Sequence, residues 1–164
     1  MYRQAMSEQL QTFVAGALSP EDVTACAALI AEGDAVDPDT AAEHLPQCLF
    51  VVVKRDGSQV VGVGAIKGQR SWYAKRIASK GKSGFEFDPD MHELGYVVTR
   101  ESHRNRGISK EITAKLLSLF QGKPLWATTS NQFMQSTLKK KGFTQKGSGW
   151  KSKKGDDLQL WIKG

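Results

Sequence analysis

Residues 93–117, with the sequence ELGYVVTRESHRNRGISKEITAKLL, contain the pattern that decides the fold of this chain. The β-branched residues in 93–99 predict a strand, and the polar residues in 100–106 predict a loop. Apolar residues then recur at helical spacing, which predicts a helix over about 107–120. The residues expected on its buried face are Ile108, Ile112, Leu116, Leu119 and Phe120. A strand that leads through a loop into a helix is typical of mixed α/β folds.

The start of that helix has the properties of an anion-binding site. The first amides of a helix have no partner within the helix, and the helix dipole places partial positive charge there. A phosphate group is therefore a natural ligand. Gly107 allows close approach of a ligand to the backbone, Ser109 can add a hydroxyl donor, and Arg104 and Arg106 add positive charge. An ordinary helix start without a ligand is the alternative.

The remaining elements follow from apolar periodicity and turn residues. Residues 1–18 are ambiguous, with weak helical periodicity. Ser19 and Asp22 form a capping box around Pro20, which predicts a helix that ends at Gly33. The other expected elements are a short helix at 38–44, a hairpin of 49–54 and 60–67, a long basic loop at 68–91, a strand at 125–129, a helix at 131–141, and a hairpin of 143–148 and 158–163. This order predicts a mixed α/β sheet.

Length and composition indicate one globular domain. The chain has 164 residues, of which 40% are hydrophobic and 24% charged, so it can bury a core. It contains no apolar run long enough for a membrane span and no apolar core of a secretion signal near Met1. Cys26 and Cys48 are too few for a disulfide scaffold and have no metal-ligand spacing. We therefore expect a cytoplasmic protein without a membrane partner.

Charge is distributed unevenly along the chain. Residues 1–50 contain one basic and eight acidic residues, a net charge of −7, whereas residues 51–164 carry +13, which gives the total of +6. The basic part indicates an anionic partner, namely a phosphorylated cofactor, a nucleic acid or a membrane surface. A lysine-rich solvated face is the alternative explanation.

Three motifs together resemble the GNAT superfamily of acyl-CoA-dependent N-acyltransferases. Arg104-x-x-Gly107-x-Ser109, between a strand and a helix, is similar to the family's pyrophosphate loop, and Glu93–Val98 resembles its fourth strand. Asn131, followed by Gly142-Phe143, resembles a second motif, in which a helix opens with Asn and ends with Gly-Phe. The resemblance covers the chain from about residue 20 to its end, with the motif region at 93–143, and it implies one GNAT-like domain over 1–164.

The resemblance implies an α+β fold with a mixed, mostly antiparallel, twisted sheet of six to seven strands and about four helices. It also implies acetyl-CoA as co-substrate, without a metal. The diphosphate would bind at the six residues of the pyrophosphate loop, and the pantetheine arm would pair with the backbone at Val97 and Val98, where two central parallel strands splay apart. Asn131 would contact that arm or hold the splayed edge. The implied loop residues are Arg104, Asn105, Arg106, Gly107, Ile108 and Ser109.

The implied reaction is direct transfer of acetyl to a primary amine of a small molecule or peptide. A base must first deprotonate the ammonium group, and Glu93 matches the position where many members have such a carboxylate. Its structural alternative is a solvent-facing residue or an ion-pair partner. Leu138 occupies the position where the family often has a tyrosine that protonates the leaving thiolate, so the proton donor is unassigned. Tyr96, Tyr73, residues 128–130 or water could replace it.

Several alternatives remain open at this stage. The basic and aromatic residues of 68–91 could bind nucleic acid or shape the acceptor site, and loss of catalysis would leave a non-catalytic acyl-CoA-binding protein. The acidic residues of 86–93 could imitate metal ligands, although Pro89 favours a turn. His44 and His103 have no evident partner, so a surface or capping role is expected. Two copies could also pair through sheet edges as a homodimer.

Overall fold

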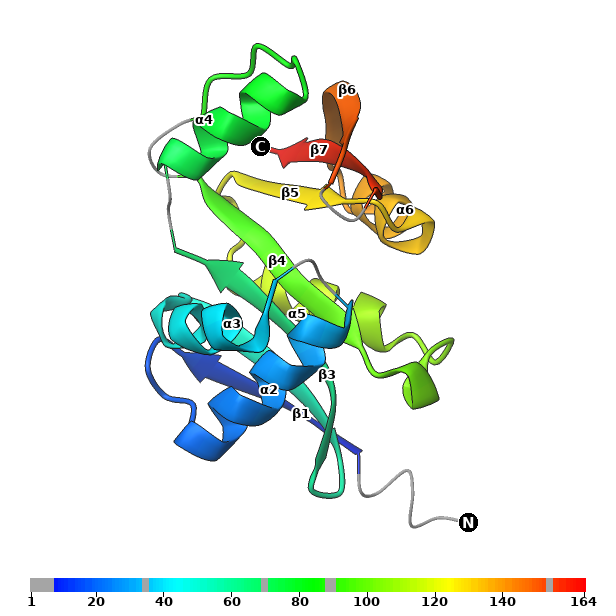
Figure 1. Ribbon diagram of the computed structural model, residues 1–164. Coiled ribbons are helices and arrows are strands. Elements are labelled where there is room, and N and C mark those ends of the chain that lie inside the picture. Colours follow the sequence, from blue (N-terminus) through cyan, green and yellow to red (C-terminus); the bar gives the residue numbers. More distant parts are fainter. Residues whose placement is uncertain (1–7, 34–35, 69–70, 88–90, 153–154) are drawn as a thin grey trace. The chain divides into compact units, whose positions relative to one another are not determined.

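A computed structural model describes residues 8–33, 36–68, 71–87, 91–152 and 155–164. Its strands form a seven-stranded sheet in the order β1-β2-β3-β4-β5-β7-β6 (Figure 1). The chain divides into two compact units, of which the first comprises residues 1–67 and 94–121 and the second comprises 68–93 and 122–164. Strand β4 (His92–Thr99) contributes residues to both units.

The first unit has strands β1 (Glu8–Val14), β2 (Phe50–Asp56) and β3 (Gln59–Lys67), which are antiparallel to their neighbours. Its α-helices are α2 (Pro20–Gly33), α3 (Pro38–His44) and α5 (Ile108–Leu119), and its short 3-10 helices are η1 (Leu45–Gln47) and η2 (Glu101–His103). Helices α2 and α3 cover one face of these strands, and α5 covers the other (Figure 1).

Glycines set the distance between α5 and the sheet. A Cβ atom on Gly62 would lie 2.7 Å from Cγ2 of Ile108, and one on Gly64 would lie 2.5 Å from Cγ2 of Ile112. On the opposite face, a Cβ atom on Gly33 would lie 2.6 Å from Cγ1 of Val98. At each position a Cβ atom would overlap a branched side chain of the facing element, so glycine allows the helix and the strand to pack closely. The first turn of α5 is thereby fixed against β3.

The second unit contains β5 (Leu125–Thr129), β6 (Thr144–Lys151) and β7 (Asp157–Lys163), with β7 antiparallel to both other strands. The start of β4 pairs with β5 in parallel, with His92 opposite Leu125 and Glu93 opposite Trp126. Helices α4 (Ser71–Lys80) and α6 (Gln132–Lys140) complete the unit. Its buried core consists of Ala74, Ile77, Met91, Trp126, Leu160 and Ile162.

The structure confirms the predicted fold class, which is α+β with a mixed, mostly antiparallel sheet and a parallel β4–β5 pair. The capping box is present, because the amide of Asp22 donates to Oγ of Ser19 at 3.2 Å. The predicted hairpins and the helices at 107–120 and 131–141 are present with small shifts of their ends. Among the described residues, no helix combines the length and apolar character that a membrane span requires.

Two predictions about elements were incomplete or wrong. The ambiguous N-terminal residues form β1, which pairs along its whole length with β2. The predicted loop at 68–91 contains α4, which raises the helix count of the described chain to five. Its apolar stripe is short, because only Ala74 and Ile77 are fully buried among lysines and arginines. Tertiary packing on the core of the second unit, rather than local periodicity, explains this helix.

Candidate functional site

The loop before α5 contains two residues in the left-handed backbone conformation, which few amino acids adopt readily. Asn105 and Gly107 both have positive φ angles, of 66° and 77°. Glycine and asparagine adopt this left-handed conformation more readily than other residues. A Cβ atom on Gly107 would have no neighbour within 4 Å. Glycine at 107 is therefore explained by its backbone conformation and leaves the helix start open to a ligand.

The start of α5 also differs from the starts of three other helices in how its amides are satisfied. Ser19, Asp37 and Asn131 accept hydrogen bonds from the first amides of α2, α3 and α6 through side-chain oxygens. Gly107 is the N-cap of α5 and has no side chain to accept such a bond. The orphan amides and the partial positive charge of α5 thus remain for an anion.

The ends of the loop are tied to the sheet by side chains. Oγ of Ser109 lies 2.7 Å from Oγ1 of Thr99, the last residue of β4. Ile108 is buried, at 4% exposure, against the β3 glycine. Ser109, which we expected to add a hydroxyl donor for phosphate, therefore shares a hydrogen bond with Thr99 in which either hydroxyl can donate. When Thr99 donates, the proton of Ser109 is left for a phosphate oxygen.

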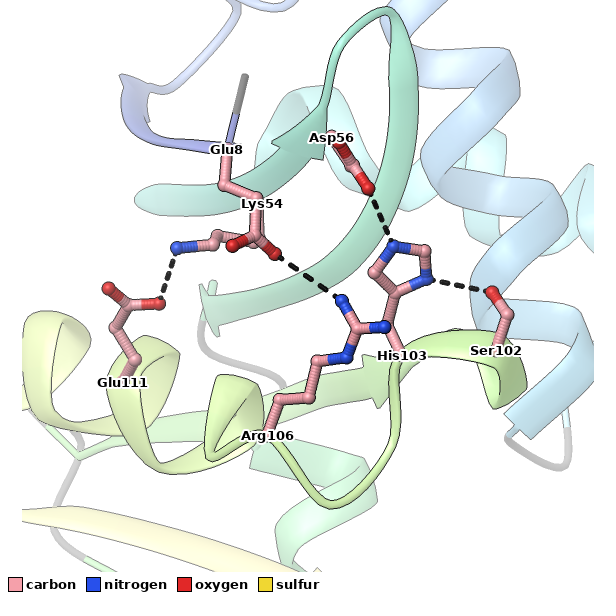
Figure 2. A network of polar contacts seen from close by, with 7 residues as sticks. All are labelled: Glu8, Lys54, Asp56, Ser102, His103, Arg106 and Glu111. Carbon is pink, nitrogen blue, oxygen red and sulfur yellow. Dashed lines mark hydrogen bonds and ion pairs between the residues drawn. The ribbon is translucent and has the colours of Figure 1, made fainter. Parts of the chain in front are cut away.

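The two loop arginines are exposed, as a phosphate-binding role requires. Nη1 of Arg106 lies 3.9 Å from Oε1 of Glu8 on β1 (Figure 2). An exposed pair at this distance is weak, so Arg106 can be drawn to a stronger anion without a large loss of stability.

The expected surface role of His103 was wrong, because the residue is buried and has partners that the sequence does not make evident. Its Nε2 atom lies 2.9 Å from Oδ2 of Asp56, and its Nδ1 atom lies 2.7 Å from Oγ of Ser102. His103 is buried, at 8% exposure. Asp56 is 47 residues away in sequence, at the end of β2, so no local pattern could reveal the pair.

His44 also has a partner that the sequence does not make evident. Its Nδ1 atom lies 3.3 Å from the hydroxyl of Tyr96 on β4. Tyr96 has a φ angle of 55° within the strand, and Nζ of Lys67 lies 3.9 Å from the centre of its ring. A bulky residue in this conformation costs of the order of 1–3 kcal/mol and is most often found at functional sites.

Val97 and Val98 follow Tyr96 and lie on opposite faces of β4. Val98 is buried against α2, whereas Val97 is half-buried, and its Cγ2 atom would lie 3.3 Å from a Cβ atom on Gly64. Both residues belong to the first unit, together with the whole of the loop from Arg104 to Ser109.

Glu93 belongs to the second unit and is only 4% exposed. The solvent-facing alternative for this residue is therefore excluded. Its main chain pairs with that of Trp126. A buried carboxylate costs free energy unless its surroundings stabilise it, and such a position suits a base as well as an ion-pair partner.

Asn131 and Leu138 also belong to the second unit. Oδ1 of Asn131 accepts hydrogen bonds from the amides of Phe133 and Met134, at 2.9 and 3.0 Å. The side-chain oxygen thus caps α6. The cap does not involve the side-chain nitrogen. Leu138 is fully buried, which explains an apolar residue there but offers no proton.

The candidate stacking residues and the candidate metal ligands of 68–93 belong to the second unit. Tyr73 and Phe85 pack against its core, so they do not present their faces as stacking platforms for bases. No group of three or more potential metal ligands occurs in the described part of the chain. Asp88 and Asp90, which the metal alternative included, lie outside the described residues.

Comparison with known proteins gives one family. The sequence model of the acetyltransferase (GNAT) family matches residues 16–143. None of the curated protein sequences compared with the chain matches it.

Solved structures share the fold. Escherichia coli ElaA has 12% sequence identity and a TM-score of 0.69, with 96% of this chain and 99% of that chain covered. An acyl-CoA N-acyltransferase from Pseudomonas aeruginosa has 11% identity and a TM-score of 0.69, with 96% and 100% covered. The structure of yncA from Salmonella typhimurium, which contains its cofactor acetyl-CoA, has 16% identity and a TM-score of 0.59, with 95% of this chain and 92% of that chain covered. At these identities the likeness establishes the fold alone.

Proposed function

Because the chain belongs to the acetyltransferase (GNAT) family, we propose that it transfers acetyl from acetyl-CoA directly to a primary amine. The observation that carries the proposal is the loop from Arg104 to Ser109. It leads from β4 into α5 with Gly107 in the left-handed conformation and without a side-chain cap. The diphosphate of acetyl-CoA would accept hydrogen bonds from the first amides of α5.

The other binding residues extend this proposal along β4. The backbone of Val97 and Val98 would pair with the pantetheine arm. The amide nitrogen of Asn131 would donate to the cofactor, since its oxygen already caps α6. A single domain over 1–164 and a cytoplasmic location remain predictions.

Glu93 would act as the base. Its carboxylate takes a proton from the ammonium group of the acceptor, because only the neutral amine is nucleophilic. The nitrogen then forms a bond to the acetyl carbon while the carbon–sulfur bond breaks, and the thiolate of CoA leaves. Leu138 cannot protonate this thiolate, and the hydroxyl of Tyr96 is engaged with His44, so we assign no acid. Glu93→Gln should lower the rate mainly below the pKa of the amine, and an unchanged pH–rate profile would exclude Glu93 as base.

Calorimetric titration with acetyl-CoA tests the binding part of the proposal. We expect micromolar binding by the wild type and no detectable binding by Gly107→Glu, which adds a negative charge at the phosphate position. Gly16→Glu is the matched control, because Gly16 has a φ angle of 75° and equally open surroundings. Gly16 follows the C-terminal end of β1, whereas Glu8, which contacts Arg106 of the loop, lies at the N-terminal end of that strand. Equal binding by all three proteins would refute the loop assignment.

The nucleic-acid alternative rests on charge alone. The second unit has 14 basic and 6 acidic residues, a net charge of +8, whereas the first has 9 and 11, a net charge of −2. For a nucleic-acid partner, the logarithm of the affinity would fall linearly with the logarithm of the salt concentration. Because Tyr73 and Phe85, two of the candidate stacking residues, are partly buried against the core, we favour a small-molecule or peptide amine as acceptor.

A further inference from the structure

Side chains from β1, β2, η2 and α5 form a polar network around the start of the phosphate loop (Figure 2). Within it, His103 lies between Asp56 and Ser102, with one ring nitrogen on each of them. The side chain of His103 is only 10% exposed. A buried imidazole costs free energy unless both of its nitrogens have hydrogen-bond partners. The bonds to Asp56 and Ser102 provide these partners, and they hold the chain just before Arg104 in place.

Other charged side chains lie beside the His103–Asp56 pair. Glu8 is opposite Asp56 in the β1–β2 ladder, and Arg106 of the loop reaches Glu8. Lys54 and Glu111 pair at 2.9 Å. These contacts connect β1 to the loop and β2 to α5 (Figure 2).

The loop is anchored before and after its two left-handed residues. His103–Asp56 holds the residue before Arg104, and the Thr99–Ser109 hydroxyl pair holds the residue after Ile108. Between these anchors, Asn105 and Gly107 have positive φ angles, which a free loop would hold only part of the time. Fixing the loop in advance removes an ordering cost that binding would otherwise include.

We propose that His103, held by Asp56, is a positioning residue for the diphosphate of acyl-CoA. The inference rests on the proposed function, because it assumes that this loop binds the diphosphate. His103 does not touch the ligand in this account. It fixes the loop so that the amides of Ile108 and Ser109 point to one place.

Two ligands separate this role from a general structural one. Acetyl-CoA carries the diphosphate, and acetyl-pantetheine presents the same thioester and arm without it. Dissociation constants for both, from NMR titration, should be compared in the wild type, His103→Gln and Asp56→Asn. We expect Kd for acetyl-CoA to rise about tenfold in both variants, the size of one charge-assisted hydrogen bond. For acetyl-pantetheine we expect a change below about twofold.

Asp157→Asn is the matched control, because it removes a carboxylate from the exposed pair with Lys151 in the second unit. It should leave both dissociation constants unchanged.

The outcomes are distinguishable. If the wild type does not bind acetyl-CoA, the proposed function itself fails. If the wild type binds and the variants bind equally well, only the role of His103 is overturned. An equal rise of Kd for both ligands would also overturn it, because that result indicates a general loss of structure. A loss of affinity for acetyl-CoA that acetyl-pantetheine does not share supports the positioning role.

Discussion

Helices α5 and α6 begin in opposite ways. At α6, Oδ1 of Asn131 accepts hydrogen bonds from two backbone amides, so the chain satisfies its own helix start. At α5, Gly107 provides no side chain, and the loop before it has two left-handed residues. A glycine N-cap costs only about a few tenths of a kcal/mol relative to Ser, Thr, Asn or Asp. The start of α5 therefore gives up little stability, and it leaves its first amides without a side-chain acceptor where a ligand can supply one.

The largest expected effect comes from displacing the start of α5. Gly62→Val would place side-chain atoms where Ile108 and Ile112 already lie, 2.7 and 2.9 Å from the new Cβ atom. Overpacking of this kind costs about 1–3 kcal/mol, and it would move the loop. Chemical denaturation should show the loss of stability, and calorimetry should show loss of acetyl-CoA binding. A variant with wild-type affinity would separate the helix position from the site.

A milder change tests the open helix start itself. Gly107→Asn keeps a residue that tolerates the left-handed conformation but brings a side-chain amide to the amides of α5. We expect little change in stability and a rise of about tenfold in Kd for acetyl-CoA, from competition for those amides. Gly16→Asn is the control, at a φ angle of 75°. Unchanged affinity of the Gly107 variant would contradict the contrast between the two helices.

The capped helix gives a smaller effect. Asn131→Ala removes the acceptor for the amides of Phe133 and Met134 and should lower the unfolding free energy by about 1 kcal/mol. Asp37→Ala removes the corresponding cap of α3, where Oδ1 accepts from the amide of Thr40 at 2.8 Å. If Asn131 also binds the cofactor, only its variant should weaken acetyl-CoA binding. Equal affinity of the two variants would restrict Asn131 to capping.

The smallest effect concerns Cys26, away from both helix starts. Burial, with a smaller contribution from Asp22, raises the pKa of this thiol from 9.0 to about 12. The folded state therefore holds its proton over an interval in which the unfolded state releases it. Stability should fall as the pH rises from about 9 towards 12. Iodoacetamide should alkylate Cys26 at pH 8 only after unfolding, and rapid alkylation of the folded protein would disagree with this burial.

Local patterns in the sequence predicted much of the fold and the central loop. The capping box at Ser19, the hairpin turn at Gly57 and the strand-loop-helix around Gly107 each carry their signal within a few residues. The sequence of β1 carries no such local signal, because this strand depends on pairing with β2, about 40 residues later. Helix α4 was missed because its short apolar stripe lies among basic residues.

The side-chain network of the site was outside the reach of the sequence for the same reason. The His103–Asp56 pair joins residues 47 positions apart, and the His44–Tyr96 contact joins residues 52 positions apart. Neither spacing belongs to one helix or one turn. The motif indicated which backbone binds a phosphate, whereas only the folded chain shows which side chains hold that backbone.

The most direct test of the open helix start is an amide NMR titration of the ¹⁵N-labelled protein. With acetyl-CoA, the account predicts large shifts for the amides of Ile108 and Ser109, because the diphosphate accepts their hydrogen bonds. With acetyl-pantetheine, which lacks the diphosphate, these two amides should shift little. Saturable binding of acetyl-CoA that leaves both amides unmoved would contradict the account.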